Sequence, residues 1–87
     1  MEVEEIAKTL RDYIVAHYAI AAGDPDFTDD VHLFDYGYVD SFGAVDLVNF
    51  VQQTFGMKIS QSDMIAYPLN TINEIATFAS LRQRGEL

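Results

Sequence analysis

The stretch from Leu33 to Gly56 reads LFDYGYVDSFGAVDLVNFVQQTFG, and it decides the fold of this 87-residue chain. Its first eight residues mix Gly, acids and aromatic residues without a sustained period. The residues that follow place apolar side chains at helical spacing as far as about Phe55, and Gly56 supplies a helix stop. The stretch therefore predicts a loop that becomes a helix at Asp40 or Ser41.

This predicted helix has one broad apolar side and one polar side. The apolar side contains Phe42, Val45, Leu47, Val48, Val51 and Phe55. The polar side contains Asp46, Asn49, Gln52 and Gln53. Of the apolar residues, we expect Leu47, Val51 and Phe55 to lie in the core.

A first helix is expected to precede the loop, from Glu2 to about Ala22. Its apolar residues recur at helical spacing, with His17 on the inner side, and Gly23 is a credible stop. Residues 24–40 then form a long loop for so small a domain, and loops of that length often carry function.

Two shorter signals predict the remaining helices. Ser60 is placed to cap a short helix that ends near Tyr67-Pro68. Thr71-Ile72-Asn73-Glu74 is a capping-box pattern, which opens a last helix with Arg82 and Arg84 in its final turn.

The sum is an all-α fold in a single domain, residues 1–87. It has three main helices, a short third helix and a long loop between the first and second helices. The predicted core contains Ile6, Leu10, Ile14, Phe34, Leu47, Val51, Phe55, Ile59, Ile72, Ile75 and Ala79. A chain of this size is not expected to enclose a deep pocket as well as a core.

Composition narrows the function classes. The net charge is −9, and eight Asp but no Lys or Arg lie between Arg11 and Lys58. That distribution argues against nucleic acid and anionic membranes and favours basic partner surfaces. The acidic start of the chain, with no long apolar run, predicts neither a signal peptide nor membrane insertion, so we expect a cytoplasmic protein.

Ser41 lies where the loop becomes a helix, and its local chemistry allows two interpretations. It can be a helix cap, because Ser is among the commonest residues there. The same place also suits a phosphate ester, since the free N–H groups and the positive helix end stabilise an attached anion.

Catalysis and calcium binding fit the chain poorly. A triad of Ser41, His32 and an Asp is conceivable, but no nucleophile-elbow spacing surrounds the serine. A calcium loop starting at Asp24 would need Gly at its sixth position and Glu at its twelfth, where the chain has Asp29 and Asp35. We therefore expect no enzyme activity and no metal site.

The pattern Asp40-Ser41-Phe42, followed by Val45-Asp46-Leu47-Val48 and then Phe55, resembles the acyl carrier protein family. The resemblance extends over nearly the whole chain, including Ile59 and the start of the last helix. It is closer to discrete polyketide-type or D-alanyl carriers than to peptidyl carriers, because Asp40 replaces a glycine-rich approach to the serine.

The resemblance implies that Ser41 receives 4′-phosphopantetheine from coenzyme A through a phosphopantetheinyl transferase that uses Mg²⁺. Asp40 would assist the transferase. The arm would hold an acyl or aminoacyl thioester, supplied by a loading enzyme and used by downstream synthases. The absence of Cys agrees with this, because the cofactor brings the thiol. We expect a free-standing, monomeric carrier.

The resemblance also implies that the second helix faces the partner enzymes. The expected partner contacts are Asp35, Phe42, Asp46, Val48, Asn49 and Met64. Gly43 stands where fatty-acid carriers often have an acid, so we expect partners that read an acidic second helix to bind less well. One alternative stays open, an adaptor that is never loaded and binds a basic partner through its acidic loop.

Overall fold

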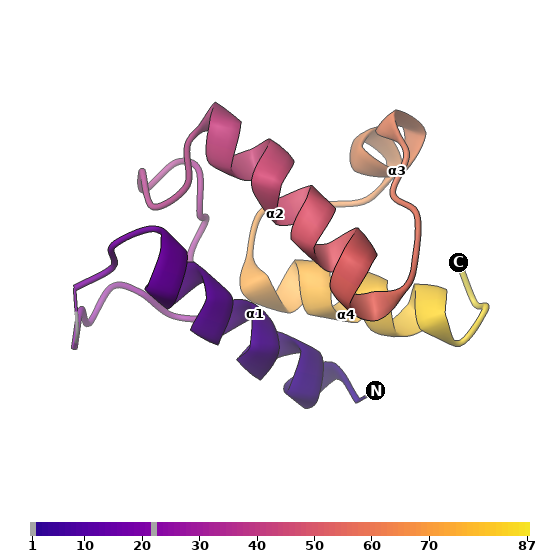
Figure 1. The fold of residues 1–87 in the computed structure, drawn as a ribbon, viewed down its shortest axis with the longest axis horizontal. Helices are drawn as coiled ribbons and strands as arrows, with labels where there is room; N and C mark the ends of the chain where they lie inside the picture. The colour runs from indigo at the N-terminus through magenta and orange to yellow at the C-terminus, as the bar shows by residue number, and fades with distance from the viewer. Residues whose placement is uncertain (1, 22) are drawn as a thin grey trace.

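The computed structural model describes residues 2–21 and 23–87, and within them the chain forms four helices and no strand. The helices are α1 (Val3–His17), α2 (Ser41–Phe55), α3 (Gln61–Ala66) and α4 (Ile72–Gln83). In Figure 1, α1, α2 and α4 surround the centre, while the short α3 stands apart at one side. The predicted all-α bundle with a short third helix is confirmed.

The core lies between α1, α2 and α4, and α1 and α4 share the largest interface. Three residues of the long loop, Val31, Leu33 and Val39, are also buried in it. The fully buried side chains include Ile6, Leu10, Ile14, Leu33, Val39, Val51 and Ile72. The predicted core is confirmed except at Phe34, which is only partly buried and packs against the core from its edge.

The first helix is shorter than predicted, because α1 ends at His17. Tyr18 donates the last helical hydrogen bond, to the carbonyl of Ile14 at 3.0 Å, and Ala19 then adopts a left-handed φ of 52°. The expected end at Ala22 lies outside the described residues. His17 is not on the inner side either: it is exposed in the last turn, with its ring stacked 4.0 Å from that of Tyr13.

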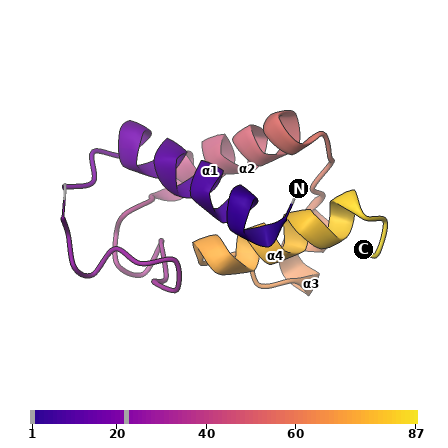
Figure 2. The same ribbon diagram turned by 90° about the horizontal axis from the view of Figure 1, so that it is seen from below.

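The long loop is held against the helices by its own acids. Arg11 donates two hydrogen bonds to Asp29, at 2.8 and 2.6 Å. Asn73 of α4 donates from its side chain to Asp30 at 2.6 Å and from its backbone to the carbonyl of Asp29 at 3.0 Å. Figure 2 shows the loop running along one end of the bundle, from the end of α1 to the start of α2. These bonds place the start of α2 relative to α1 and α4.

The last two helices begin as predicted, each with a complete capping box, at Ser60 for α3 and at Thr71 for α4. None of the residues of α3 is buried. Arg82 of α4 holds this helix by donating to Asp63 at 2.9 and 3.3 Å and to the carbonyl of Lys58 at 3.1 Å. The third helix is therefore attached mainly through polar contacts.

The apolar side of α2 is only partly covered. Leu47, Val51 and Phe55 are buried as predicted. Phe42 and Val45, which were not in the predicted core, are 88% and 64% exposed. The other helices therefore cover the face of α2 that contains Leu47 and Val51 and leave Phe42 and Val45 uncovered.

Candidate functional site

Ser41 is the first residue of α2, and its side chain is exposed. The cap of the helix is Asp40, whose Oδ1 accepts a hydrogen bond from the backbone N–H of Gly43 at 2.8 Å. The interpretation of Ser41 as the cap was therefore wrong. Among the described residues the Ser41 hydroxyl has no hydrogen-bond partner. It stands at the positive end of a helix, free to carry a phosphate ester.

The first turns of α2 are linked to the end of α1 through Asp46. The hydroxyls of Tyr13 and Tyr18 both donate to Asp46 Oδ2, each at 2.6 Å. These bonds, from Tyr13 and then Tyr18, lower the pKa of the Asp46 carboxyl. Burial, followed by the bond to Asp46, raises the pKa of the Tyr18 phenol. Asp46 was expected to be a partner contact, and the structure gives it internal partners as well.

Gly43 is buried under the ring of Tyr18, although glycine is unusual inside a helix. A Cβ on Gly43 would lie 2.9 Å from both Cε1 of Tyr18 and Cγ1 of Val39. The hydroxyl of the same tyrosine lies 3.1 Å from the Gly43 carbonyl oxygen. The glycine at this position therefore makes room for the aromatic ring.

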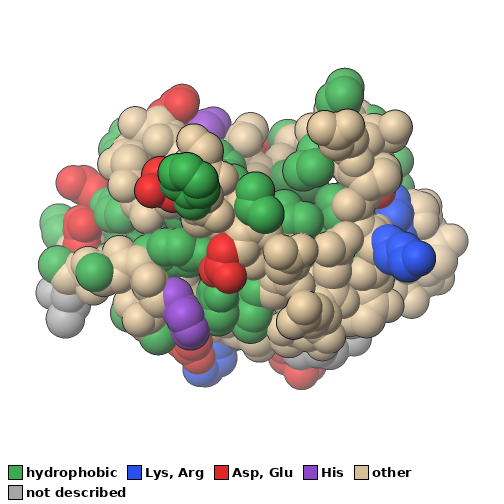
Figure 3. All heavy atoms as spheres, turned by 45° about the horizontal axis from the view of Figure 1, so that its top comes forward, with side chains coloured by type: hydrophobic (Ala, Val, Ile, Leu, Met, Phe, Trp, Pro, Cys, Tyr) green, Lys and Arg blue, Asp and Glu red, His purple; other side chains and the backbone are tan. Residues whose placement is uncertain are grey.

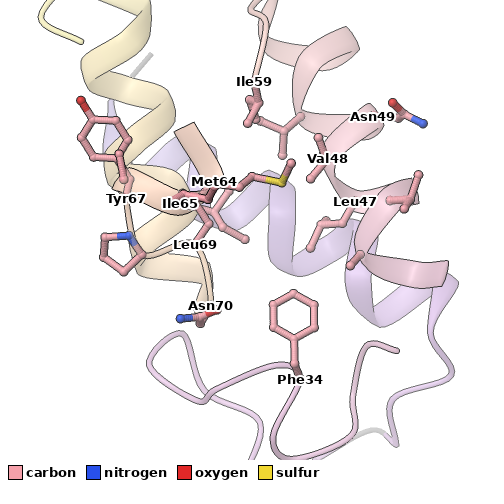
Figure 4. A pocket seen from close by; sticks show the side chains of 16 residues that line it. Phe34, Leu47, Val48, Asn49, Ile59, Met64, Ile65, Tyr67, Leu69 and Asn70 are labelled. Atoms are coloured by element: carbon pink, nitrogen blue, oxygen red, sulfur yellow. The ribbon is translucent and has the colours of Figure 1, made fainter. Parts of the chain in front are cut away.

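An apolar groove of about 620 Å³ opens between α2, α3 and the segment that joins α3 to α4. In Figure 4, Leu47 and Val48 lie on one side, Met64 and Leu69 lie on the other, and Phe34 closes one end. Its polar lining residues include Asn49 and Asn70. The groove is open to solvent, and it exists because α3, which has no buried residue, stands off the bundle.

The surface beside Ser41 is apolar as well. Phe42 and Val45 of α2 are exposed, and so are Met64 and Ile65 of α3 at the mouth of the groove. Figure 3 shows hydrophobic side chains gathered over this face of the molecule. The expected contacts Val48 and Asn49 also lie on α2 and line the groove, so the structure brings five of the six expected partner residues to α2 and α3.

The acids of the loop are mostly engaged inside the molecule. Besides Asp29 and Asp30, Asp24 accepts from Tyr38 at 3.0 Å and from the backbone of Asp26 at 2.9 Å. Asp35, the sixth expected partner contact, remains exposed, with its carboxylate 3.7 Å from His32. Only part of the acid-rich stretch is thus available to a partner.

Neither the triad nor the calcium loop is assembled. His32 Nδ1 accepts a hydrogen bond from the backbone N–H of Asp35 at 3.0 Å, and no hydrogen bond joins it to Ser41 among the described residues. In the same part of the chain, no three His, Asp or Glu side chains are placed to hold a metal ion together.

The chain was compared with known protein families. The family model described as the phosphopantetheine attachment site matches residues 7–79. No curated protein matches the chain closely enough to count as a relative. Because the family model covers most of the chain, the chain belongs to the phosphopantetheine-binding, acyl-carrier family, whose cofactor is covalently attached 4′-phosphopantetheine. The described helices include none long and apolar enough to span a membrane.

Proposed function

We propose that this member of the phosphopantetheine-binding family carries an acyl or aminoacyl thioester on an arm attached to Ser41 Oγ. The observation that supports the proposal best is the free, exposed hydroxyl of Ser41, beside an aspartate that already caps the helix. A serine required as a cap would lose that bond on modification, whereas this one loses nothing. Asp40 is exposed and is a candidate for transferase recognition.

In this proposal the protein is the scaffold that carries the arm, and it contributes no catalytic group of its own. It contains no Cys, and the thiol of the attached arm supplies the thioester chemistry when present. The helix N-terminus at Ser41 stabilises the phosphodiester charge. The loop bonds from Arg11 and Asn73 hold that terminus in place. The protein would act in the cytoplasm as a monomer, modified by a phosphopantetheinyl transferase and then used by loading and synthase enzymes.

The groove supports an acyl cargo over a small aminoacyl one. Its lining is mainly aliphatic and aromatic, and an alkyl chain placed there is removed from water at about 25 cal/mol per Å². We therefore expect an octanoyl-loaded protein to unfold at a higher temperature than the acetyl-loaded or alanyl-loaded protein. Equal unfolding temperatures for the three forms would remove the support that the groove gives to an acyl cargo.

The partner surface is proposed to include Phe42, Val48, Asn49 and Met64, with Asp35 at its edge. Phe42, Val48 and Asn49 belong to the helix that begins with Ser41, and Met64 lines the groove beside Val48 and Asn49. An enzyme that accepts the arm must approach this face. A basic rim on that enzyme would suit the exposed Asp35.

Loading separates the carrier from the unloaded adaptor. The purified protein is incubated with coenzyme A, Mg²⁺ and a promiscuous transferase, and its intact mass is measured. The carrier gains the mass of one phosphopantetheinyl group, Ser41→Ala gains none, and the control Ser62→Ala, an exposed serine of α3, gains it normally. No gain in the wild type would favour the adaptor.

A further inference from the structure

Tyr13, Tyr18 and Asp46 form a tyrosine–aspartate cluster between α1 and α2. Both phenols donate to the same carboxylate oxygen, Oδ2, at 2.6 Å. Hydrogen bonds to an ionised acceptor are about twice as strong as those between neutral groups. Two donors on one oxygen fix the carboxylate with respect to the end of α1, while Oδ1 accepts no hydrogen bond from the described residues.

The aromatic rings of the cluster also pack against one another and against neighbouring rings. The Tyr13 ring lies between His17, at 4.0 Å, and Phe50 of α2, at 3.8 Å, both nearly parallel to it. The Tyr18 ring lies edge-on to Tyr13, at 6.2 Å. Stacked and edge-on aromatic pairs have preferred geometries, so these contacts restrict how the rings are oriented.

The cluster reaches the turn that contains Ser41 through Gly43. The Tyr18 ring covers the Cα of Gly43, and its hydroxyl also approaches the Gly43 carbonyl at 3.1 Å. The backbone N–H of Gly43 is meanwhile held by the Asp40 cap. The turn from Asp40 to Gly43 is thus fixed on one side by its cap and on the other by Tyr18.

Besides the loop bonds and the buried Val39 that precedes it, few contacts restrain this turn. Ser41 and Phe42 are exposed, and the backbones of α1 and α2 do not run close together along their lengths. Leu47 is the first fully apolar residue of α2 to be buried, a turn and a half after Ser41. The side chains of Tyr13 in α1 and Tyr18 directly after it therefore connect the two helices where their backbones are not in contact.

We propose that Tyr13, Tyr18 and Asp46 are positioning residues, which hold the first turn of α2 so that Ser41 is presented to the transferase in one orientation. This inference rests on the proposed loading at Ser41. It changes the role expected for Asp46, from a charge that a partner enzyme binds to an acceptor that ties α2 to α1.

The two roles predict different kinetics for Asp46→Asn, Tyr18→Phe and Tyr13→Phe when loading is measured with coenzyme A and a transferase. If Asp46 positions the turn, Asp46→Asn and Tyr18→Phe each lower kcat by about tenfold, equivalent to about 1.4 kcal/mol and comparable with one charge-assisted hydrogen bond. KM and its salt dependence then change little. The double variant that combines Asp46→Asn with Tyr18→Phe is no slower than the slower of these two single variants, because each substitution removes the same contact.

Asp26→Asn is the matched control, since it removes an exposed acid whose side chain makes no hydrogen bond to α2. We expect its kcat to equal that of the wild type. Circular dichroism confirms that each variant is folded. The backbone amide resonances of Ser41 and Gly43 in the unloaded protein give a readout independent of the transferase. They should shift in Tyr18→Phe and Asp46→Asn but not in Asp26→Asn.

A raised, salt-sensitive KM for Asp46→Asn, together with wild-type kinetics for both Tyr→Phe variants, would overturn the inference and return Asp46 to the partner surface. Unmoved Ser41 and Gly43 resonances would overturn it too. If the wild type itself is not loaded, the proposed function fails, and the amide resonances still decide whether the cluster holds the turn.

Discussion

A Cβ atom on Gly43 would lie 2.9 Å from Cε1 of Tyr18, closer than such atoms approach in folded proteins. The two residues lie 25 positions apart, and they fit together only because residue 43 has no side chain. The glycine that separates this chain from carriers with an acid at that position is therefore a packing requirement of the Tyr18 ring.

Gly43→Ala should lower stability, although glycine-to-alanine changes inside helices usually raise it by about 1 kcal/mol. The added methyl group meets both Tyr18 and the buried Val39, and overpacking of this kind costs about 1–3 kcal/mol. Urea unfolding measures the difference. A variant more stable than the wild type would show that the ring moves aside freely.

Ala19→Gly should raise stability, because Ala19 has a φ of 52° at the end of α1. The left-handed conformation costs a non-glycine residue about 1–2 kcal/mol, part of which glycine loses again through its freedom in the unfolded chain. We expect a net gain of about 0.5–1 kcal/mol. Ala16→Gly, an exposed helical position in the same helix, is the control and should lose about 1 kcal/mol. A loss at both positions would contradict the left-handed assignment.

The Asp63–Arg82 pair should make stability depend on acid pH. Hydrogen bonds from Arg82, and then from the backbone of Ser60, lower the pKa of the Asp63 carboxyl from 3.8 to about 2. A lowered carboxyl pKa stabilises the fold above the unfolded value, and the contribution disappears as the pH falls from about 4 towards 2.

Unfolding free energies of the wild type and Asp63→Asn should therefore differ most above pH 4 and converge near pH 2. Asn keeps an acceptor for the capping box of α3, so the comparison isolates the charge. A gap that stays constant over this range would mean that the pair does not couple to folding.

The Arg11–Asp29 contact should contribute more to the free energy of unfolding than the neighbouring exposed acids do. Asp29→Asn weakens two hydrogen bonds that hold the loop to α1, and we expect a loss of about 1 kcal/mol, since the pair is only partly buried. Asp26→Asn removes the same charge at an exposed position and should change stability by less than about 0.5 kcal/mol. Thermal unfolding in low salt compares the two, and equal losses would assign the effect to net charge alone.

The parts of the fold that depend on local chemistry could be predicted from the sequence. The capping boxes at Ser60 and Thr71 need only residues three apart, and both are present. The end of α1 could not be predicted in this way. Gly23 is the stronger stop signal in the sequence, but the chain leaves the helix at Tyr18, whose side chain reaches the start of α2.

In the site, too, the local features could be predicted and those that depend on distant residues could not. The Asp40-Ser41 pattern pointed to the helix end and to the family, and both are shown. The internal role of Asp46 could not be predicted, because Tyr13 and Tyr18 lie 33 and 28 positions away. Periodicity also could not tell which part of a broad apolar side the other helices cover, so the exposure of Phe42 and the groove beside α3 appear only in three dimensions.

The position of the added group on the chain decides whether Ser41 is the attachment site. After incubation with coenzyme A, Mg²⁺ and the transferase, the protein is fragmented in a mass spectrometer and each fragment is weighed. We predict one phosphopantetheinyl group, on Ser41, in the wild type and an unmodified chain in Ser41→Ala. A group found on any other residue, or an unmodified wild type, would contradict the assignment of Ser41 as the attachment site.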